Sequence, residues 1–181
     1  MAYRPDLILL DEPFSALDQH LRERLQHEMS AMLEDYRGQV IMVSHSRDEI
    51  YRFSEELLVM ENGSLLARGN TREIFDSPGT MEVASMTGCK NFSAAAKTGD
   101  HTLHLTDWGI DLHLNGEIPD DVTCIGYRAH FFEPVWGERK ENCLPFNPSG
   151  MDDLPFERRY YIRPEGDYSA AKHLIDSSAG R

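Results

Sequence analysis

The sequence LILLDEPFSALDQ, residues 7–19, places four consecutive apolar residues directly before two carboxylates and a proline. An unbroken apolar run of this kind is typical of a strand that is covered on both faces, as in a parallel sheet. Pro13 ends the strand pattern. Asp11 and Glu12 therefore lie at the carboxyl end of the predicted strand, which is where open α/β sheets gather their ligands.

Helices and further strands are predicted to alternate after this opening. Apolar residues recur at helical spacing from Leu17 to Tyr36, and Gly38 is expected to end the helix as its C-cap. A second apolar strand over 40–43 leads to His45. Ser46, with Glu49 three residues later, predicts a capping box at the start of a helix over 47–53.

The next segment predicts a hairpin and two short helices. The elements expected in order are a strand over 57–60, an Asn62-Gly63 turn, a strand over 64–67, and helices over 71–75 and 81–86. Strands alternating with helices predict an α/β doubly wound fold.

The apolar period falls to two from about Asn91, with alternating residues over 103–105 and 110–114 and a further strand over 122–127. We therefore expect two domains, an α/β domain over 1–90 and a small β-barrel-like domain over 91–181. The segment after Asn142 is rich in Pro, Gly and Asp, and only one strand is expected there, at 159–163.

Composition excludes some classes of protein. The net charge of −13 argues against a nucleic-acid partner, because phosphate contacts need a basic footprint. The cysteines, at positions 89, 124 and 143, form no C-x-x-C pair and favour reduced thiols in a cytosolic protein. No signal peptide is recognisable, and no apolar run approaches the roughly 18 residues of a spanning helix.

The strand ends carry residues suited to phosphate chemistry. An Asp after an apolar strand is how P-loop NTPases hold Mg²⁺ through water, and a second carboxylate can orient or deprotonate an attacking water. A histidine at the end of the next strand can donate to a phosphate oxygen as charge develops. Each residue alone also fits a plainer role: Asp11, Glu12 and Asp18 as acids favoured near a helix N-terminus, and His45 as a surface side chain. Their combination in this order favours the catalytic interpretation.

LILLDEPFSALD resembles the Walker B strand, catalytic Glu and D-loop of ABC transporter ATPase subunits, and VIMVSHSRDEI is similar to the strand and switch histidine that follow. LVMENGSLLARGNTREIFDSP resembles the closing hairpin and helix of the same domain. The resemblance implies that Asp11 holds the water shell of Mg²⁺, Glu12 polarises the attacking water and His45 contacts the γ-phosphate of ATP. It also implies that Ser15 and Asp18 face a second ATPase subunit across the nucleotide.

The second region is similar to the TOBE-type β-domain of importer ATPases. TGCKNFSAA and IGYRAHFFEP resemble the entry to that domain and one of its strands, most closely in the molybdate group. The sequence contains no G-x-x-x-x-G-K-[ST] loop and no LSGGQ-like signature, both of which precede the Walker B strand in the family. The chain is therefore expected to correspond to the C-terminal portion of a longer ATPase.

The resemblance implies ATP hydrolysis coupled to uptake of an oxyanion such as molybdate, with ATP and Mg²⁺ as cofactors. A homodimeric second subunit and a membrane permease are the implied partners, and the implied location is cytoplasmic, at the inner face of the cell membrane. Because the phosphate loop is missing, we expect this chain to be inactive alone. The alternative is a non-catalytic module for solute sensing or dimerisation that carries an ATPase remnant.

Other groups in the β-region carry weaker signals. His101, His104 and His113 raise the question of a metal site, but strand alternation places His101 and His104 on opposite faces, which favours solvated histidines. Arg158 and Arg159 fit either an anion site or a solvated pair.

Overall fold

The computed structural model describes residues 5–135, 137–138, 140–155, 158–164 and 175–179. The chain divides into two compact units, Met1–Pro78 and Gly79–Arg181. The first unit mixes strands with helices and the second is mainly β, so the predicted α/β fold followed by a small β-domain is confirmed. None of the helices within the described ranges is long and apolar enough to cross a membrane.

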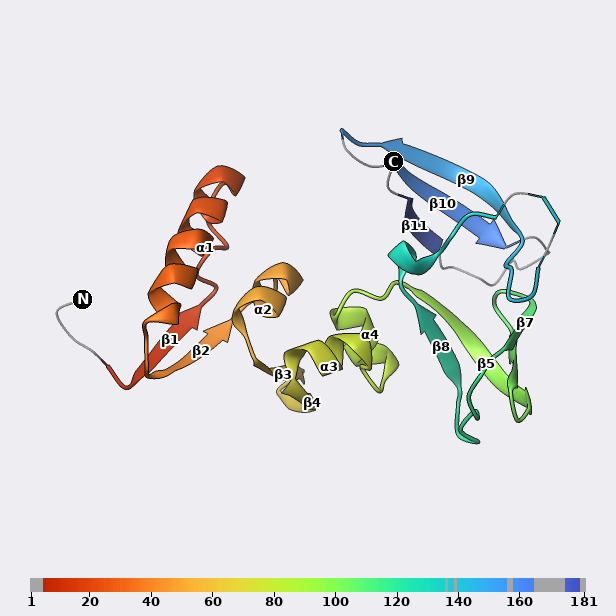
Figure 1. Ribbon diagram of the computed structural model, residues 1–181, viewed down its shortest axis with the longest axis horizontal. Coiled ribbons are helices and arrows are strands. Elements are labelled where there is room, and N and C mark those ends of the chain that lie inside the picture. The colour runs from red at the N-terminus through yellow and green to blue at the C-terminus, as the bar shows by residue number, and fades with distance from the viewer. Residues whose placement is uncertain (1–4, 136, 139, 156–157, 165–174, 180–181) are drawn as a thin grey trace. The chain divides into compact units, whose positions relative to one another are not determined.

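The first unit contains a parallel pair of strands and an antiparallel hairpin (Figure 1). Its elements are β1 (Leu7–Asp11), α1 (Gln19–Glu34), β2 (Gln39–Val43), α2 (Arg47–Phe53), β3 (Glu56–Glu61), β4 (Ser64–Asn70) and α3 (Thr71–Asp76). β1 pairs with β2 in register from Leu7↔Gln39 to Asp11↔Val43, so both strands end at the same edge. The predicted Asn-Gly turn joins β3 to β4, with φ of 50° at Asn62 and 78° at Gly63.

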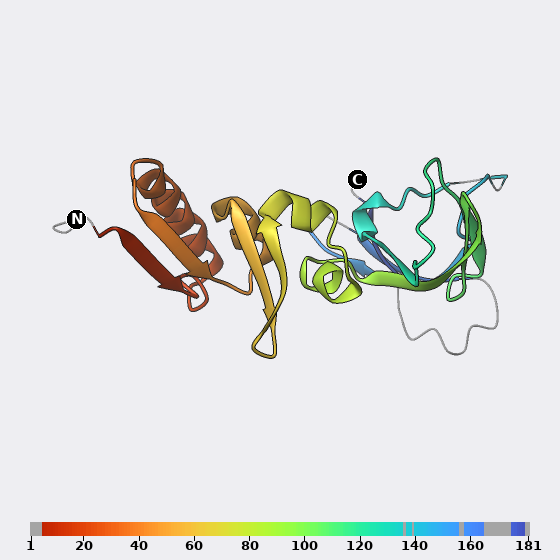
Figure 2. The ribbon, with the colours of Figure 1, turned by 90° about the horizontal axis from the view of Figure 1, so that it is seen from below.

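The β1–β2 pair is covered on one face only, and the prediction that the opening strand is covered on both faces is wrong. α1 lies along one face of the pair (Figures 1 and 2). The other face carries Leu7, Leu9, Ile41 and Val43, of which Leu9 is 69% exposed and Ile41 is 54% exposed. Within the described residues this sheet has only two strands, and the exposure of these side chains shows that this face is uncovered.

α1 ends earlier than predicted. Its C-cap is Asp35 in the right-handed helical region, so the expectation that Gly38 would cap it is wrong. Gly38 is required for a different reason, because a Cβ there would overlap the Tyr36 ring and lie 2.7 Å from the backbone oxygen of Asp6. The Tyr36 hydroxyl donates to the backbone oxygen of Pro5 at 2.6 Å. The glycine thus lets this tyrosine cross close to the chain entering β1.

The second unit begins with α4 (Met81–Met86) and continues as two sheets. The four-stranded sheet has the order β7 (Ile110–His113), β6 (Thr102–Leu105), β5 (Asn91–Gly99), β8 (Cys124–Tyr127), and it curves strongly (Figure 2). A short 3₁₀ turn, η1 (Ala129–Phe131), precedes the three-stranded sheet of β9 (Phe146–Asp153), β10 (Arg158–Pro164) and β11 (Ile175–Ala179). The predicted barrel-like domain is therefore a pair of open sheets over the residues described, not a closed barrel.

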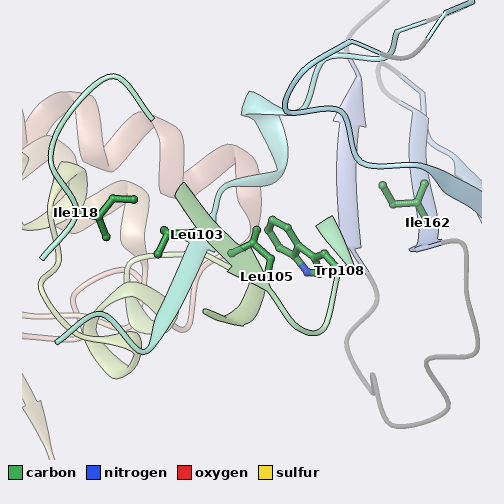
Figure 3. Packing of buried hydrophobic residues seen from close by; sticks show 5 residues of the cluster. All are labelled: Leu103, Leu105, Trp108, Ile118 and Ile162. Carbon is green, nitrogen blue, oxygen red and sulfur yellow. The ribbon is translucent and has the colours of Figure 1, made fainter. Parts of the chain in front are cut away.

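The core of the second unit is the region that its two sheets share. Leu103 and Leu105 are 1% and 0% exposed, and Trp108, Ile118 and Ile162 complete the buried cluster (Figure 3). In Figure 3 the Trp108 ring lies between Leu105 of β6 and Ile162 of β10. β10 thereby contributes to the core, and the tail beyond Asn142 is more regular than the sequence indicated.

Candidate functional site

The carboxyl ends of β1 and β2 bring Glu12 and His45 together. Glu12 donates its backbone N–H to the Val43 oxygen at 2.9 Å, which extends the parallel ladder by one residue past β1. Its own backbone is left-handed, with φ of 45°, a conformation that only a few per cent of non-glycine residues adopt. His45 Nε2 lies 3.5 Å from Glu12 Oε1. The structure thus places the predicted base and the predicted histidine within reach of one small ligand.

The two side chains differ in their exposure. The Glu12 side chain is 29% exposed, and its Oε1 atom is buried without a hydrogen bond to the described residues. The His45 side chain is 95% exposed. A carboxylate oxygen that has no hydrogen-bond donor keeps its capacity to accept from a water or a hydroxyl group that reaches it. The arrangement can therefore polarise a bound water while the histidine donates to a neighbouring group.

Asp11 is separated from this pair by strand alternation. It follows Leu9 on the uncovered face of β1 and its side chain is exposed. Its carboxylate forms no hydrogen bond or ion pair with another side chain among the described residues. A single solvated carboxylate suits the outer water shell of Mg²⁺, which commonly takes one or two carboxylates together with phosphate oxygens. The described residues contain no group of three or more histidines, cysteines or carboxylates that could hold a metal ion.

Ser15 and Asp18 both act locally in the turn after Glu12. The Ser15 hydroxyl donates to the Glu12 backbone oxygen at 3.0 Å. Asp18 is the N-cap of α1 and accepts from the Leu21 N–H at 3.0 Å. Both side chains remain exposed, so these bonds shape the turn without burying it. Phe14 anchors the same turn, being 3% exposed and stacked on Phe53 with ring centroids 5.9 Å apart.

Glu49 forms hydrogen bonds to both neighbours of His45, of which the sequence alone predicted only the one to Ser46. Half of the predicted capping box is present, because the Ser46 hydroxyl accepts from the Glu49 N–H at 3.4 Å. The Glu49 carboxylate does not return to the Ser46 N–H as the motif requires. It accepts from the Ser44 hydroxyl at 2.6 Å instead. In the sequence, the only indication of this contact to Ser44 is the serine on each side of His45.

The histidines of the second unit do not form a metal centre within the described residues. His104 Nδ1 lies 2.7 Å from Asp111 across β6 and β7, and His101 Nδ1 lies 3.0 Å from the Gly116 oxygen. Both are partly exposed cross-strand or loop contacts. Arg158 is paired with Asp153 at 3.1 Å, and this contact raises the pKa of the arginine. These partners favour the solvated, structural interpretation of those groups.

The three cysteines form no disulfide within the described residues. Cys89 is buried against the face of β8, where a Cβ at Gly126 would lie 3.1 Å from its sulfur. Burial raises the pKa of the Cys89 thiol. A protonated, shielded thiol is a packing residue and takes no part in the site.

Comparison with known proteins gives relatives of one kind. No family model matches the chain. The chain is 40% identical over 88 residues to the Fe(3+) ions import ATP-binding protein FbpC of Haemophilus influenzae, an overlap of 49% of this chain and 25% of that protein. It is 36% identical over 91 residues to the spermidine/putrescine import ATP-binding protein PotA of Ureaplasma parvum, covering 50% of this chain and 18% of the relative.

A third relative extends over both units. The sulfate/thiosulfate import ATP-binding protein CysA 2 of Chromobacterium violaceum is 28% identical over 172 residues, which cover 92% of this chain and 45% of that protein. The chain thus spans less than half the length of each of these three relatives. The predicted resemblance is confirmed at this level, since the homologues of this chain are ATP-binding subunits of ABC importers.

Proposed function

We propose that this chain carries the hydrolytic end of the ATP site of an importer ATPase subunit. The observation that supports the proposal most is the pairing of Glu12 with His45 at 3.5 Å where β1 and β2 end. In this role Glu12 Oε1, which is buried and without a donor, accepts a hydrogen bond from the attacking water and draws off its proton. His45 donates to the terminal phosphate as negative charge develops on it.

The remaining roles follow from position. Asp11 would hold Mg²⁺ through water, and the ion would neutralise charge on the phosphate oxygens of ATP. The turn that contains Ser15 and Asp18 is exposed, which is compatible with the proposed contact to a second subunit across the nucleotide. A membrane permease would complete the importer. The peripheral location at the cytoplasmic face of the membrane belongs to this proposal as well.

We also propose an oxyanion as the transported solute, with molybdate as one candidate. Support comes from the sulfate/thiosulfate relative, whose match covers 92% of the chain and therefore includes the second unit. The iron relatives match 49% of the chain, and the polyamine relatives match between 50% and 68% of it. We propose that the second unit, with its curved four-stranded sheet, contains the TOBE-type domain. The proposed domain bounds are 1–90 for the partial ATPase domain and 91–181 for the TOBE-type domain.

The test is a chimera. The segment of the Haemophilus influenzae iron importer subunit that matches this chain over 88 residues is replaced by the corresponding residues of this chain. We expect the chimera to hydrolyse ATP. Glu12→Gln should lower turnover by at least about 100-fold while ATP binding is kept, because the shape remains and the base is lost. Glu23→Gln, an exposed acid on α1, is the matched control for the change in charge.

Two results would contradict the proposal. Turnover that is unchanged in both Glu12→Gln and His45→Ala would remove these residues from the hydrolytic site. A chimera that binds ATP but never hydrolyses it, although it folds and dimerises, would favour the alternative of a non-catalytic module.

A further inference from the structure

His45 lies at the centre of a short segment whose geometry is fixed by its neighbours. Its ring is 95% exposed, and within the described residues its one polar side-chain contact is with Glu12, at 3.5 Å. A ring with so little packing is positioned by the backbone that carries it, and not by surrounding side chains. The orientation of His45 therefore depends on what holds residues 44–46.

Two hydroxyl groups hold this segment, one on each side of the histidine. The Ser44 hydroxyl accepts from the Ser46 N–H at 3.0 Å and donates to Glu49 Oε2 at 2.6 Å. The Ser46 hydroxyl accepts from the Glu49 N–H at 3.4 Å, and the Ser46 backbone oxygen accepts from the Ile50 N–H at 3.0 Å. Glu49 therefore binds both neighbours of His45, one through its carboxylate and one through its amide.

The carboxylate of Glu49 is held in place by the rest of the first unit. The residue is only 4% exposed, although it is charged and lies in the first turn of α2. Its second oxygen, Oε1, accepts from the side-chain amide of Gln26 on α1 at 3.3 Å. Burial of a carboxylate costs free energy unless hydrogen-bond donors satisfy its oxygens. The two donors of Glu49 come from α1 and from the residue after β2, so this carboxylate links α1, the end of β2 and α2.

We propose that Glu49 is a positioning residue, which fixes the 44–46 turn so that His45 is presented toward Glu12. The hydrogen bond between Glu49 and Ser44 is responsible for this effect, because the same Ser44 hydroxyl also accepts from the Ser46 N–H. Gln26 steadies the carboxylate without touching the turn. The inference rests on the proposed function for the role of His45, but its structural content is independent of ATP.

The experiment is native-state hydrogen exchange by NMR on the full chain. Glu49→Ala leaves Ser44 and Ser46 intact, yet we expect the Ser46 amide to exchange about fivefold to tenfold faster, because the Ser44 hydroxyl loses its anchor. The Thr71 amide, which donates to the Glu55 oxygen at 2.9 Å, reports on the stability of the first unit and should change little. Gln26→Ala is the matched control, since it alters the other partner of the same carboxylate.

A second readout follows the histidine itself. In the unmodified chain, Glu12→Gln should shift the His45 imidazole resonances, because the two groups are 3.5 Å apart. In the Glu49→Ala background the same substitution should produce a much smaller shift. Glu49→Gln should restore both readouts, because its side-chain oxygen can accept from Ser44 while the Gln26 amide turns its oxygen toward the new donor.

The outcomes separate the alternatives. Equal acceleration of the Ser46 and Thr71 amides in Glu49→Ala would overturn the proposal, because Glu49 would then only stabilise the unit. Unchanged Ser46 exchange would overturn it as well. A positive result combined with a chimera whose turnover is insensitive to Glu12→Gln would leave the positioning role intact and refute the proposed function alone.

Discussion

Glu12 combines a chemical role with backbone strain. Its φ of 45° lies in the left-handed region, where a Cβ costs about 1 kcal/mol and glycine is free of that cost. We therefore expect Glu12→Gly to be more stable than Glu12→Ala by about 1 kcal/mol, the reverse of the usual order for these two residues. Urea denaturation of the two variants, followed by circular dichroism, measures the difference. An alanine variant as stable as the glycine variant would contradict the left-handed turn.

Asp18 carries two proposed roles that substitutions can separate. As the N-cap of α1 it accepts from the Leu21 N–H, so Asp18→Ala should lower the free energy of unfolding by about 1 kcal/mol. Asp18→Asn keeps the acceptor and should cost little. If the asparagine variant nevertheless fails to support dimerisation of the chimera, the charge acts at the subunit contact. Equal destabilisation by both variants would show that the cap is not the structural role.

The position of the candidate residues at one edge of the sheet was predictable from motif order, whereas their local geometry was not, and their catalytic roles stay a prediction. The order of Asp11, Glu12 and His45 along two strands was sufficient to place them at one edge of a sheet. The left-handed turn at Glu12 and the Glu49–Ser44 bond leave no signal in a single sequence, because both depend on contacts between segments that meet only after folding.

The β1–β2 pair leaves one apolar face exposed to solvent. It is a two-stranded parallel sheet within the described residues, and its uncovered face exposes Leu9, Ile41 and Val43 by 69%, 54% and 52%. Contiguous exposed apolar residues on a sheet favour association. We expect the chain to associate as its concentration rises and Leu9→Lys to weaken this association, as measured by sedimentation velocity.

Glu23→Lys is the control for this substitution, because it makes at least as large a change in charge on the exposed surface of α1. If Leu9→Lys and Glu23→Lys affect association equally, net charge governs it and the apolar face does not. If the chain remains monomeric up to high concentration, the uncovered face does not drive association at all.

Two short helices that begin with clear capping residues were predicted well, and a strand without apolar alternation was not. α2 and α4 have the predicted bounds of 47–53 and 81–86 because capping residues precede both. β9 was missed because it is exposed along its whole length and contains Pro148 and Gly150, so that no alternation marks it. Covering of β1 on both faces was inferred from its composition, but composition cannot specify which other element supplies the cover.

At the scale of the molecule, the second unit depends on one core. Leu105 is 0% exposed and belongs to the cluster that joins residues of the four-stranded sheet to Ile162 of β10. Leu105→Ala should therefore lower the free energy of unfolding of this unit by roughly 2–5 kcal/mol. Hydrogen exchange of the β5 and β6 amides measures the effect. Loss of less than about 1 kcal/mol would mean that the two sheets are stabilised independently of this cluster.

The charge of the chain bears on its behaviour toward nucleotide. ATP binding in P-loop folds depends on loop amides and a lysine around the β- and γ-phosphates, and the 181 residues contain no such loop sequence. Asp11 and Glu12 are both acidic in a chain of net charge −13, so the field at this edge should repel a polyphosphate. Mg²⁺ offsets this repulsion only partly, because one or two carboxylates hold the ion weakly.

We therefore expect isothermal titration of the chain with Mg-ATP to show no binding, and a phosphate-release assay to show no turnover. Micromolar affinity with turnover that Glu12→Gln removes would show instead that the described edge is a complete site.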